Sequence, residues 1–291
     1  MTAPILAATD FSEPARIAVE RASRLADPRR CPLQLLHVYN DLAWASLRVL
    51  MHEPPGYDVE AGARERLRVL AGELAARHGL SGVESTVVSG RAAAGITARA
   101  RAIGAGLVVL GAQGAGMAKE LALGGTAIKV LRASPCPVLV TQREPERRYA
   151  RVLVATDFSD TATRAMRQAL ELFPEAELHA VHAYSVALEG RMRSAGATDE
   201  DITRYREQAR IDAERRMAAF VADADYRAAG GMITSVWFGY AASVVLEVIQ
   251  RGDFDLLVIG RHGASRLDEW VMGSVSLNLM HHASCDVLLV P

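Results

Sequence analysis

The sequence predicts an α/β protein of two tandem domains, each built on a five-stranded parallel sheet with helices on both faces. The phrase Ala-Thr-Asp-Phe-Ser occurs twice, at residues 8–12 and 155–159, and the same series of predicted elements follows each copy. The period of about 147 residues is too long for a solenoid repeat, so each unit is a whole domain. The strand segments are continuously apolar, which is typical of parallel strands buried on both faces.

Length and composition set the broad class of protein. The 291 residues are enough for two domains, and 50% hydrophobic with 23% charged residues is a globular composition. A formal net charge of −1 gives no attraction to nucleic acid or to an anionic membrane. We expect no signal peptide and no membrane span. Cys31, Cys136 and Cys285 lack metal-type spacing, so we expect buried, reduced thiols in a cytoplasmic protein.

The first strand of each half ends at the repeated phrase. Apolar runs at 5–8 and 152–155 lead into it, and Ser12 and Ser159 are the predicted N-caps of the helices that follow. Asp10 and Asp157 therefore stand at the carboxyl end of a strand, where open parallel sheets bind ligands. The alternative is that these carboxylates only shape the turn between strand and helix.

The middle of each half is a strand, a long charged helix and a second strand. The first of these strands carries a histidine two residues before its last tyrosine, and we expect His37 and His182 to be core or rim residues. The segments 40–57 and 185–200 follow this strand and are either lids or plain surface. Core packing is the default for Trp44, Met51 and Trp237. The predicted strands are 32–39 and 176–184, the helices 58–79 and 199–224, and the next strands 83–90 and 232–239.

The fourth strand of each half ends in a glycine motif. Two glycines three residues apart are followed, after nine residues, by Gly124-Gly125-Thr126 in the first half and Gly273-Ser274 in the second. Glycines let the backbone turn at the strand exit and let a ligand approach it. The N–H groups and the dipole at the start of the next helix favour a phosphate. The motif predicts an anion cradle in each half, and it is not a Walker A loop.

The glycine spacing, the Thr-Asp of the first strand and the closing Cys-Pro-Val-Leu-Val at 136–140 resemble the universal stress protein family, across both halves of the chain. This resemblance implies a Rossmann-like fold, similar to that of adenine nucleotide alpha hydrolases, which binds ATP, with or without Mg²⁺, in many members and no nucleotide in others. It implies that the first-strand Asp and the end of the second strand surround adenosine, while the glycine loops hold ribose and phosphates. The implied site residues are Thr156, Asp157, Ala183, Gly260, Gly263, Gly273 and Ser274 in the second half, and Thr9, Asp10, Val38, Gly111, Gly114 and Gly124 in the first.

The two halves depart from the family pattern at different places. Gly125 stands where Ser or Thr is expected, so a phosphate-facing hydroxyl is missing there unless Thr126 supplies it. Ala183 stands where the first half has Val38, and it offers less apolar surface to an adenine. These differences predict that the second half binds ATP more tightly.

The loops of the two glycine motifs differ in charge, because Ala112 and Gln113 stand in the first where Arg261 and His262 stand in the second. Arg261, His262 and Arg266 either face the phosphates or are solvated surface residues. His281 and His282 are neighbours on a helix, so they point in different directions and are expected to be polar residues of its last turn rather than a metal site.

The resemblance and the motifs favour an ATP-binding regulatory protein of the stress response, with at most slow ATP hydrolysis. No group that the motif requires serves as a base or metal carboxylate at a γ-phosphate. A nucleotide-free interaction scaffold is the alternative. An enzyme that splits ATP to AMP and pyrophosphate is disfavoured, because residues 8–15 read Ala-Thr-Asp-Phe-Ser-Glu-Pro-Ala where those related enzymes resemble one another through a Ser-Gly-Gly-x-Asp-Ser loop.

The predicted domains are residues 1–141 and 150–291, joined by a charged linker at 142–149. An apolar edge strand needs a partner, so we expect the last strands, around 138–140 and 287–290, to pair the halves as an intramolecular pseudo-dimer. The sequence leaves open whether the chain also forms a homodimer. The expected ligand is an adenine nucleotide, with neither nucleic acid nor membrane as a partner.

Overall fold

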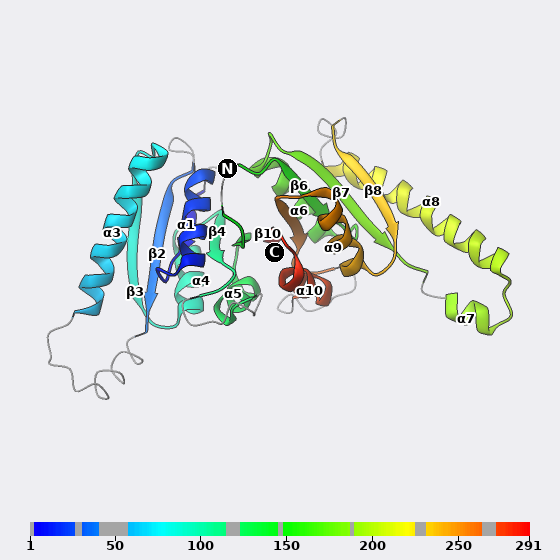
Figure 1. Ribbon diagram of the computed structural model, residues 1–291, viewed down its shortest axis with the longest axis horizontal. Coiled ribbons are helices and arrows are strands. Elements are labelled where there is room, and N and C mark those ends of the chain that lie inside the picture. The colour runs from blue at the N-terminus through cyan, green and yellow to red at the C-terminus, as the bar shows by residue number, and fades with distance from the viewer. Residues whose placement is uncertain are drawn as a thin grey trace. The chain divides into compact units, whose positions relative to one another are not determined.

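The computed structural model describes residues 3–26, 31–40, 58–114, 123–144, 148–186, 189–224, 231–263 and 272–291, and Figure 1 shows its elements. The chain divides into two compact units, Met1–Arg148 with Pro291, and Tyr149–Val290. None of the helices within the described ranges combines the length and the apolarity that a membrane span requires. The three cysteines are buried and none forms a disulfide, as the sequence predicts.

The first unit is a parallel sheet with strand order β3-β2-β1-β4-β5. Helices α1 and α3 pack against each other, and α4 packs against α5. Right-handed crossovers place these two pairs on opposite faces, because the chain reverses its direction across the sheet after β3. The elements are β1 (Ile5–Ala8), α1 (Glu13–Leu25), β2 (Leu33–Tyr39), α3 (Val59–His78), β3 (Val83–Ser89), α4 (Ala92–Ala102), β4 (Leu107–Gly111), α5 (Gly125–Ala133) and β5 (Val138–Thr141).

The second unit repeats this order as β8-β7-β6-β9-β10, again all parallel. Helices α6 and α8 pack together, and α9 packs with α10. The prediction of two tandem α/β domains with parallel sheets is therefore confirmed. The elements are β6 (Arg151–Ala155), α6 (Asp160–Leu172), β7 (Glu177–Tyr184), α7 (Glu189–Ser194), α8 (Asp199–Ala224), β8 (Ile233–Phe238), α9 (Ala241–Gly252), β9 (Leu256–Gly260), α10 (Ser274–His282) and β10 (Asp286–Val290).

The central strands form the core of each unit. Every residue of β1 and of β5 is buried, as is every residue of β10, which explains why these segments are apolar without alternation. Helix α3 buries only a stripe at spacings of three and four residues, so its other faces carry the charges noted in the sequence. The buried residues of that stripe are Ala63, Leu67, Ala71 and Leu74.

Local signals place the helix ends where the sequence predicts them. The Ser12 hydroxyl accepts a hydrogen bond from the backbone N–H of Ala15, and the Ser159 hydroxyl accepts one from Ala162, so both serines are N-caps. Helix α3 ends at Gly79, whose φ of 64° is the left-handed conformation that glycine adopts without strain.

Two features of the second unit differ from the sequence prediction. A short helix, α7, lies within the 185–200 segment, where the sequence shows no clear period. Tyr149, predicted to belong to the linker, is buried in the second unit and donates a hydrogen bond from its hydroxyl to Asp286 at 2.6 Å. The sequence did not reveal this contact, because Asp286 lies 137 residues after Tyr149 in the chain.

Candidate functional site

Each unit has a cavity at the carboxyl ends of its central strands. In the first unit it lies between the ends of β1 and β4, and in the second between the ends of β6 and β9. These are the points where the strand order reverses, which is where open α/β sheets bind ligands. The cavity volumes are about 370 Å³ in the first unit and about 290 Å³ in the second.

The cavities collect the residues that the sequence singled out, with one exception. Arg261 is buried, with 8% of its surface exposed, and it does not line the second cavity, although its neighbour His262 does. Arg266 lies outside the described residues. The first cavity is lined by Thr9, Asp10, Val38, Gly111, Gly114, Gly124, Gly125 and Thr126. The second is lined by Thr156, Asp157, Ala183, Gly260, Gly263, Gly273 and Ser274.

The repeated Thr-Asp-Phe-Ser phrase forms the same turn in both units. In the first, the backbone N–H of Phe11 donates to Thr9 Oγ1 at 3.0 Å, and that of Ser12 donates to Asp10 Oδ1 at 3.0 Å. The matching distances in the second unit are 2.9 and 3.1 Å. The phenylalanine has a φ of 63° or 65°, which is rare outside glycine. The turn-shaping role considered for the two aspartates is therefore real, and it occupies one carboxylate oxygen of each.

The other oxygen of each aspartate faces the glycine motif. A Cβ atom on Gly114 would lie 2.9 Å from Asp10 Oδ2, and one on Gly263 would lie 2.7 Å from Asp157 Oδ2. Both distances are shorter than van der Waals contact, so a side chain at either position would displace the carboxylate. The second glycine of the motif is therefore needed to let the carboxylate and the loop approach each other across the cavity.

The first glycine of each motif serves packing instead. A Cβ on Gly111 would lie 2.7 Å from the carbonyl oxygen of Pro14, in the first turn of α1. A Cβ on Gly260 would lie 2.8 Å from the Thr161 methyl group in α6. These glycines let the helix after the first strand lie directly on the end of the fourth strand. The motif thus combines a packing glycine with a cavity glycine.

Backbone hydrogen bonds join the two parts of each motif. Gly124 N donates to the Ala112 carbonyl at 2.7 Å, and Gly273 N donates to the Arg261 carbonyl at 3.0 Å. Ala112 and Arg261 are tied in turn to the last strand of their units, where their N–H groups donate to Thr141 and Val290. Arg261 therefore shapes the site through its backbone, which a prediction based on its charge did not consider.

The helices α5 and α10 begin at the cavities, and their N-caps are Gly124 and Gly273, which supply no side-chain cap. The N–H groups of a first helical turn need partners from outside the helix, and here the cavity is the side from which a ligand can supply them. The dipole at a helix start favours an anion. Thr126 and Ser274 add hydroxyl groups to the cavity lining at these helix starts.

A three-residue stack beside each cavity was not predicted from the sequence. The repeated phenylalanine contacts a histidine of the second strand and an arginine of the long helix. The signal was present, since both the phenylalanine and the histidine recur in both halves, but the arginine partner required the tertiary structure. In the stack Arg66–Phe11–His37, the Phe11 ring centre lies 4.2 Å from Arg66 Cζ and 4.7 Å from the His37 ring centre. In Arg216–Phe158–His182, the corresponding distances from the Phe158 ring centre are 4.6 and 4.1 Å.

The histidines of the two stacks are tied to the first strand. Nδ1 of His37 lies 2.8 Å from the Thr9 carbonyl oxygen, and Nδ1 of His182 lies 2.8 Å from that of Thr156. A carbonyl oxygen only accepts, so Nδ1 is the donor in both. Burial lowers the pKa of His182 below its ordinary value, with a further contribution from the charge of Arg216, while the Thr156 carbonyl and Asp157 oppose the shift.

The remaining sequence candidates that the structure describes do not line the two cavities. His281 and His282 are in the last turn of α10, and no group of three or more metal-ligating side chains occurs among the described residues. Trp237 is half-buried on β8, with Arg251 5.5 Å from its ring centre. Trp44 and Met51 lie outside the described residues. Of the two segments considered as lids, 41–57 is not described, and no described residue of 185–200 lines the second cavity.

Comparisons with known proteins agree on one family for both halves. The model of the universal stress protein family matches residues 1–142 and 148–291. Universal stress protein YxiE of Bacillus subtilis (strain 168) is 31% identical over 145 residues, which are 47% of this chain and 97% of that protein. A solved universal stress protein from Archaeoglobus fulgidus DSM 4304 shares the fold with a TM-score of 0.69 at 19% identity, covering 100% of this chain and 98% of its own. A universal stress protein solved in complex with cAMP is 26% identical over 50% of this chain and 99% of its own, with a TM-score of 0.35.

Proposed function

The chain belongs to the universal stress protein family, as its paired motifs indicated, and we propose that each half binds an adenine nucleotide in its cavity. The ligand is ATP, with or without Mg²⁺, and its role is regulatory. The observation that carries this proposal is the duplicated cavity, in which one carboxylate faces a glycine loop and an uncapped helix start lies beside them.

The charges of the cavity suggest how the ligand is oriented. The helix starts at Gly125 and Ser274 favour the phosphates, because a helix N-terminus favours an anion. Asp10 and Asp157 would repel phosphates, so they belong to the adenosine end, where a carboxylate accepts hydrogen bonds from ribose hydroxyl groups. Val38 and Ala183 provide apolar surface at the end of the second strand for the base.

We assign the cavities a binding role rather than fast catalysis. The described lining of each cavity includes a single carboxylate, Asp10 or Asp157, and one oxygen of that carboxylate already holds the turn. Fast phosphoryl transfer needs a group that positions the nucleophile in line with the γ-phosphate. A slow hydrolysis is compatible with this assignment.

Calorimetry on the full chain tests the proposal. Ala92 and Ala241 are the first residues of α4 and α9, and each lines one cavity. We expect one ATP per cavity in the unchanged chain, loss of the first site in Ala92→Phe and loss of the second in Ala241→Phe. Ala94→Phe and Ser243→Phe, at exposed positions of the same helices, are the matched controls.

The alternatives give different results in the same samples. A chain that produces no heat with ATP and releases no nucleotide on denaturation is a nucleotide-free scaffold. Stoichiometric formation of AMP and pyrophosphate indicates an adenylating enzyme. The expected pairing of the halves through β5 and β10, and the cytoplasmic location, stay predictions; cysteine cross-linking between the two strands would test the pairing.

A further inference from the structure

The two outer strands β3 and β8 differ in how they are protected. Within the described residues, each pairs with only one neighbour, β2 or β7. Strand β3 carries Glu84, which accepts a hydrogen bond from Gln34 at 2.8 Å, and Gln34 in turn accepts one from Arg99. Strand β8 reads Ile-Thr-Ser-Val-Trp-Phe and has no charged residue. Charges on an edge strand discourage pairing with another chain. The charged Glu84 therefore protects β3 against such pairing, and β8 has no corresponding charge.

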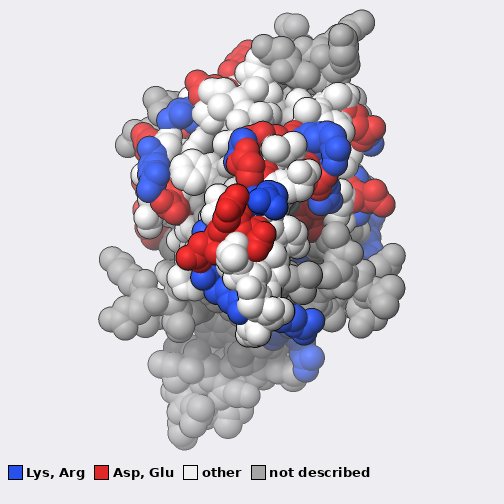
Figure 2. All heavy atoms as spheres, turned by 90° about the vertical axis from the view of Figure 1, so that its right-hand side faces the viewer, with Lys and Arg blue, Asp and Glu red and all other residues white. Residues whose placement is uncertain are grey.

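Exposed apolar side chains gather around β8. Most of the large hydrophobic residues that are exposed in the described chain belong to α8, to β8 or to the turn after it. The charged side chains visible on this side of the molecule are of both signs and lie among uncharged surface (Figure 2). The residues are Tyr205, Ile211, Ile233, Phe238 and Tyr240, with exposed fractions of 36, 44, 49, 47 and 85%.

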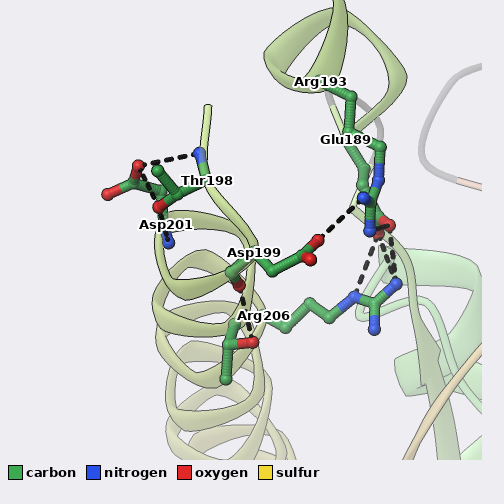
Figure 3. Close-up of polar contacts among 7 residues, drawn as sticks. Glu189, Arg193, Thr198, Asp199, Asp201 and Arg206 are labelled. Carbon is green, nitrogen blue, oxygen red and sulfur yellow. Dashed lines mark hydrogen bonds and ion pairs between the residues drawn. The ribbon is translucent and has the colours of Figure 1, made fainter. Parts of the chain in front are cut away.

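One face of β8 is covered by α8, and a cluster of ion pairs fixes that helix. Arg206 of α8 lies 4.9 Å from the Phe238 ring centre and donates from Nε to Glu189 of α7 at 3.0 Å. Glu189 also accepts from Arg193, which donates to Asp199 at 2.9 Å (Figure 3). These contacts hold α7 and α8 together above the Phe238 face of the strand.

The opposite face of β8 carries Ile233, Ser235 and Trp237, since successive side chains of a strand alternate. Ile233 is 49% exposed, and Trp237 donates from Nε1 to Ser235 Oγ at 3.1 Å. The strand therefore offers an edge with which no second described strand pairs, an exposed aliphatic side chain and a half-buried indole, and none of these residues lines the second cavity.

We propose that β8 pairs with β8 of a second copy of this chain, antiparallel, around a two-fold axis at Ser235. Residues opposite each other in an antiparallel pair lie on the same face, so this register places Ile233 opposite the second copy's Trp237, twice, and Ser235 opposite its own equivalent. Pairs of aromatic and β-branched side chains stabilise antiparallel strands. The two-fold axis closes the assembly at two chains.

Cross-linking tests the register on the full chain. Cα atoms directly opposite in an antiparallel pair are about 4.5–5.5 Å apart, within the range that a disulfide spans. Ser235→Cys with oxidised glutathione is expected to give a covalent dimer. Ile233→Cys is the matched control on the same face, because its two copies lie four residues apart in this register, about 13 Å, and it should remain uncrosslinked. The native cysteines are buried and do not interfere.

Sedimentation velocity over a concentration series tests the association itself. The unchanged chain is expected to move from one to two chains, and Ser235→Glu, which places two carboxylates opposite each other, is expected to stay at one. Thr86→Glu, at the same place on β3, should leave the association unchanged. A single chain at every concentration overturns the proposal, as does a dimer that persists in Ser235→Glu without cross-linking in Ser235→Cys. A mass that rises without a plateau also overturns it, because β8 would then pair with β3 of the next copy.

Discussion

The two units differ in where they place the bulky side chain between the second strand and the helix that follows the third strand. In the first, Val38 is the last residue but one of β2 and faces Gly95 of α4, where a Cβ would lie 3.0 Å from a Val38 methyl group. In the second, Ala183 is the last residue but one of β7, and Val244 stands at the corresponding place of α9, four residues after the N-cap. Bulk lost from the strand is restored on the helix. A motif residue is therefore comparable between the units only together with the residue it packs against.

The starts of α5 and α10 show a similar exchange. The first unit has Gly125-Thr126 and the second has Ser274-Val275, and all of these residues line the cavities. The hydroxyl group is present in both units, displaced by one residue. The difference in ATP affinity between the two sites is thus expected to be smaller than Gly125 alone suggests. The predictions below test how large that difference is.

The largest effect is expected from Gly111→Ala. Its Cβ would meet a backbone oxygen of Pro14 at 2.7 Å, which cannot move without shifting α1, and overpacking costs about 1–3 kcal/mol. We expect a loss of about 3 kcal/mol in the first unit. Gly260→Ala meets a Thr161 methyl group at 2.8 Å, a softer neighbour, and should destabilise the second unit less.

Denaturant unfolding followed by hydrogen exchange and mass spectrometry resolves the two units and measures this difference. Gly125→Ala is the control, because a Cβ there has no other atom within 4 Å. Equal losses in Gly111→Ala and Gly125→Ala would show that close packing of α1 is not the reason for Gly111.

The next effect is on ATP affinity at the helix starts. A hydrogen bond to a charged group is worth about 1.5–3 kcal/mol, so Ser274→Ala should weaken the second site by about one to two decades. Thr126→Val, which keeps the shape of the side chain, should weaken the first site by as much if the displaced hydroxyl serves the same phosphate.

Each variant is titrated with ATP in a chain whose other cavity is blocked by Ala92→Phe or Ala241→Phe, so that the two sites are measured separately. If Thr126→Val has no effect and Gly125→Ser strengthens the first site, the hydroxyl groups are not equivalent and the units differ as the motif alone suggests. If neither substitution changes affinity, the phosphates do not lie at these helix starts.

A smaller effect on ATP affinity is expected from substitutions of the two aspartates. Here the contribution of the carboxylate to the turn can be separated from the contribution of its charge. Asp157→Asn keeps an oxygen that accepts from Ser159 N, so the turn remains, but it removes the charge. We expect about tenfold weaker ATP binding at the second site with little change in stability. Asp157→Ala removes the turn bond as well and should also lower the unfolding free energy by about 1 kcal/mol.

The same pair at Asp10, in calorimetry and denaturant unfolding, checks whether the first unit behaves alike. An Asn variant with unchanged affinity in either unit would leave that aspartate with the turn-shaping role alone.

The smallest expected effect is a dependence of the second unit's stability on pH. The pKa of His182 is lowered from its ordinary 6.5, so the folded state binds this proton less readily than the unfolded chain. Stability is therefore full above about pH 6.5 and falls as the pH drops from there through the lowered pKa. Unfolding free energies between pH 7.5 and 5 measure it, and His182→Gln should flatten the second unit's dependence. An unchanged slope would assign the dependence to other groups.

The sequence by itself determined the elements and their order, with the exception of the short helix α7. The repeat, the apolar strands and the caps Ser12 and Ser159 predicted the tandem parallel α/β domains, and the glycine spacing identified residues that line the two cavities. Such features are local: a strand buried on both faces must be apolar, and a serine just before a helix caps it with its own hydroxyl group.

The tertiary structure decided what depends on contacts between distant segments. It divided the glycines into one that packs on α1 or α6 and one that faces an aspartate, and it buried Arg261. It brought Arg66 and Arg216 onto the repeated phenylalanines and paired the volumes of Val38 and Gly95. The sequence gives the size and charge of each of these residues. Their roles, however, depend on contacts with residues far away along the chain, and no repeating pattern in the sequence predicts those contacts, so they are visible only in the folded chain.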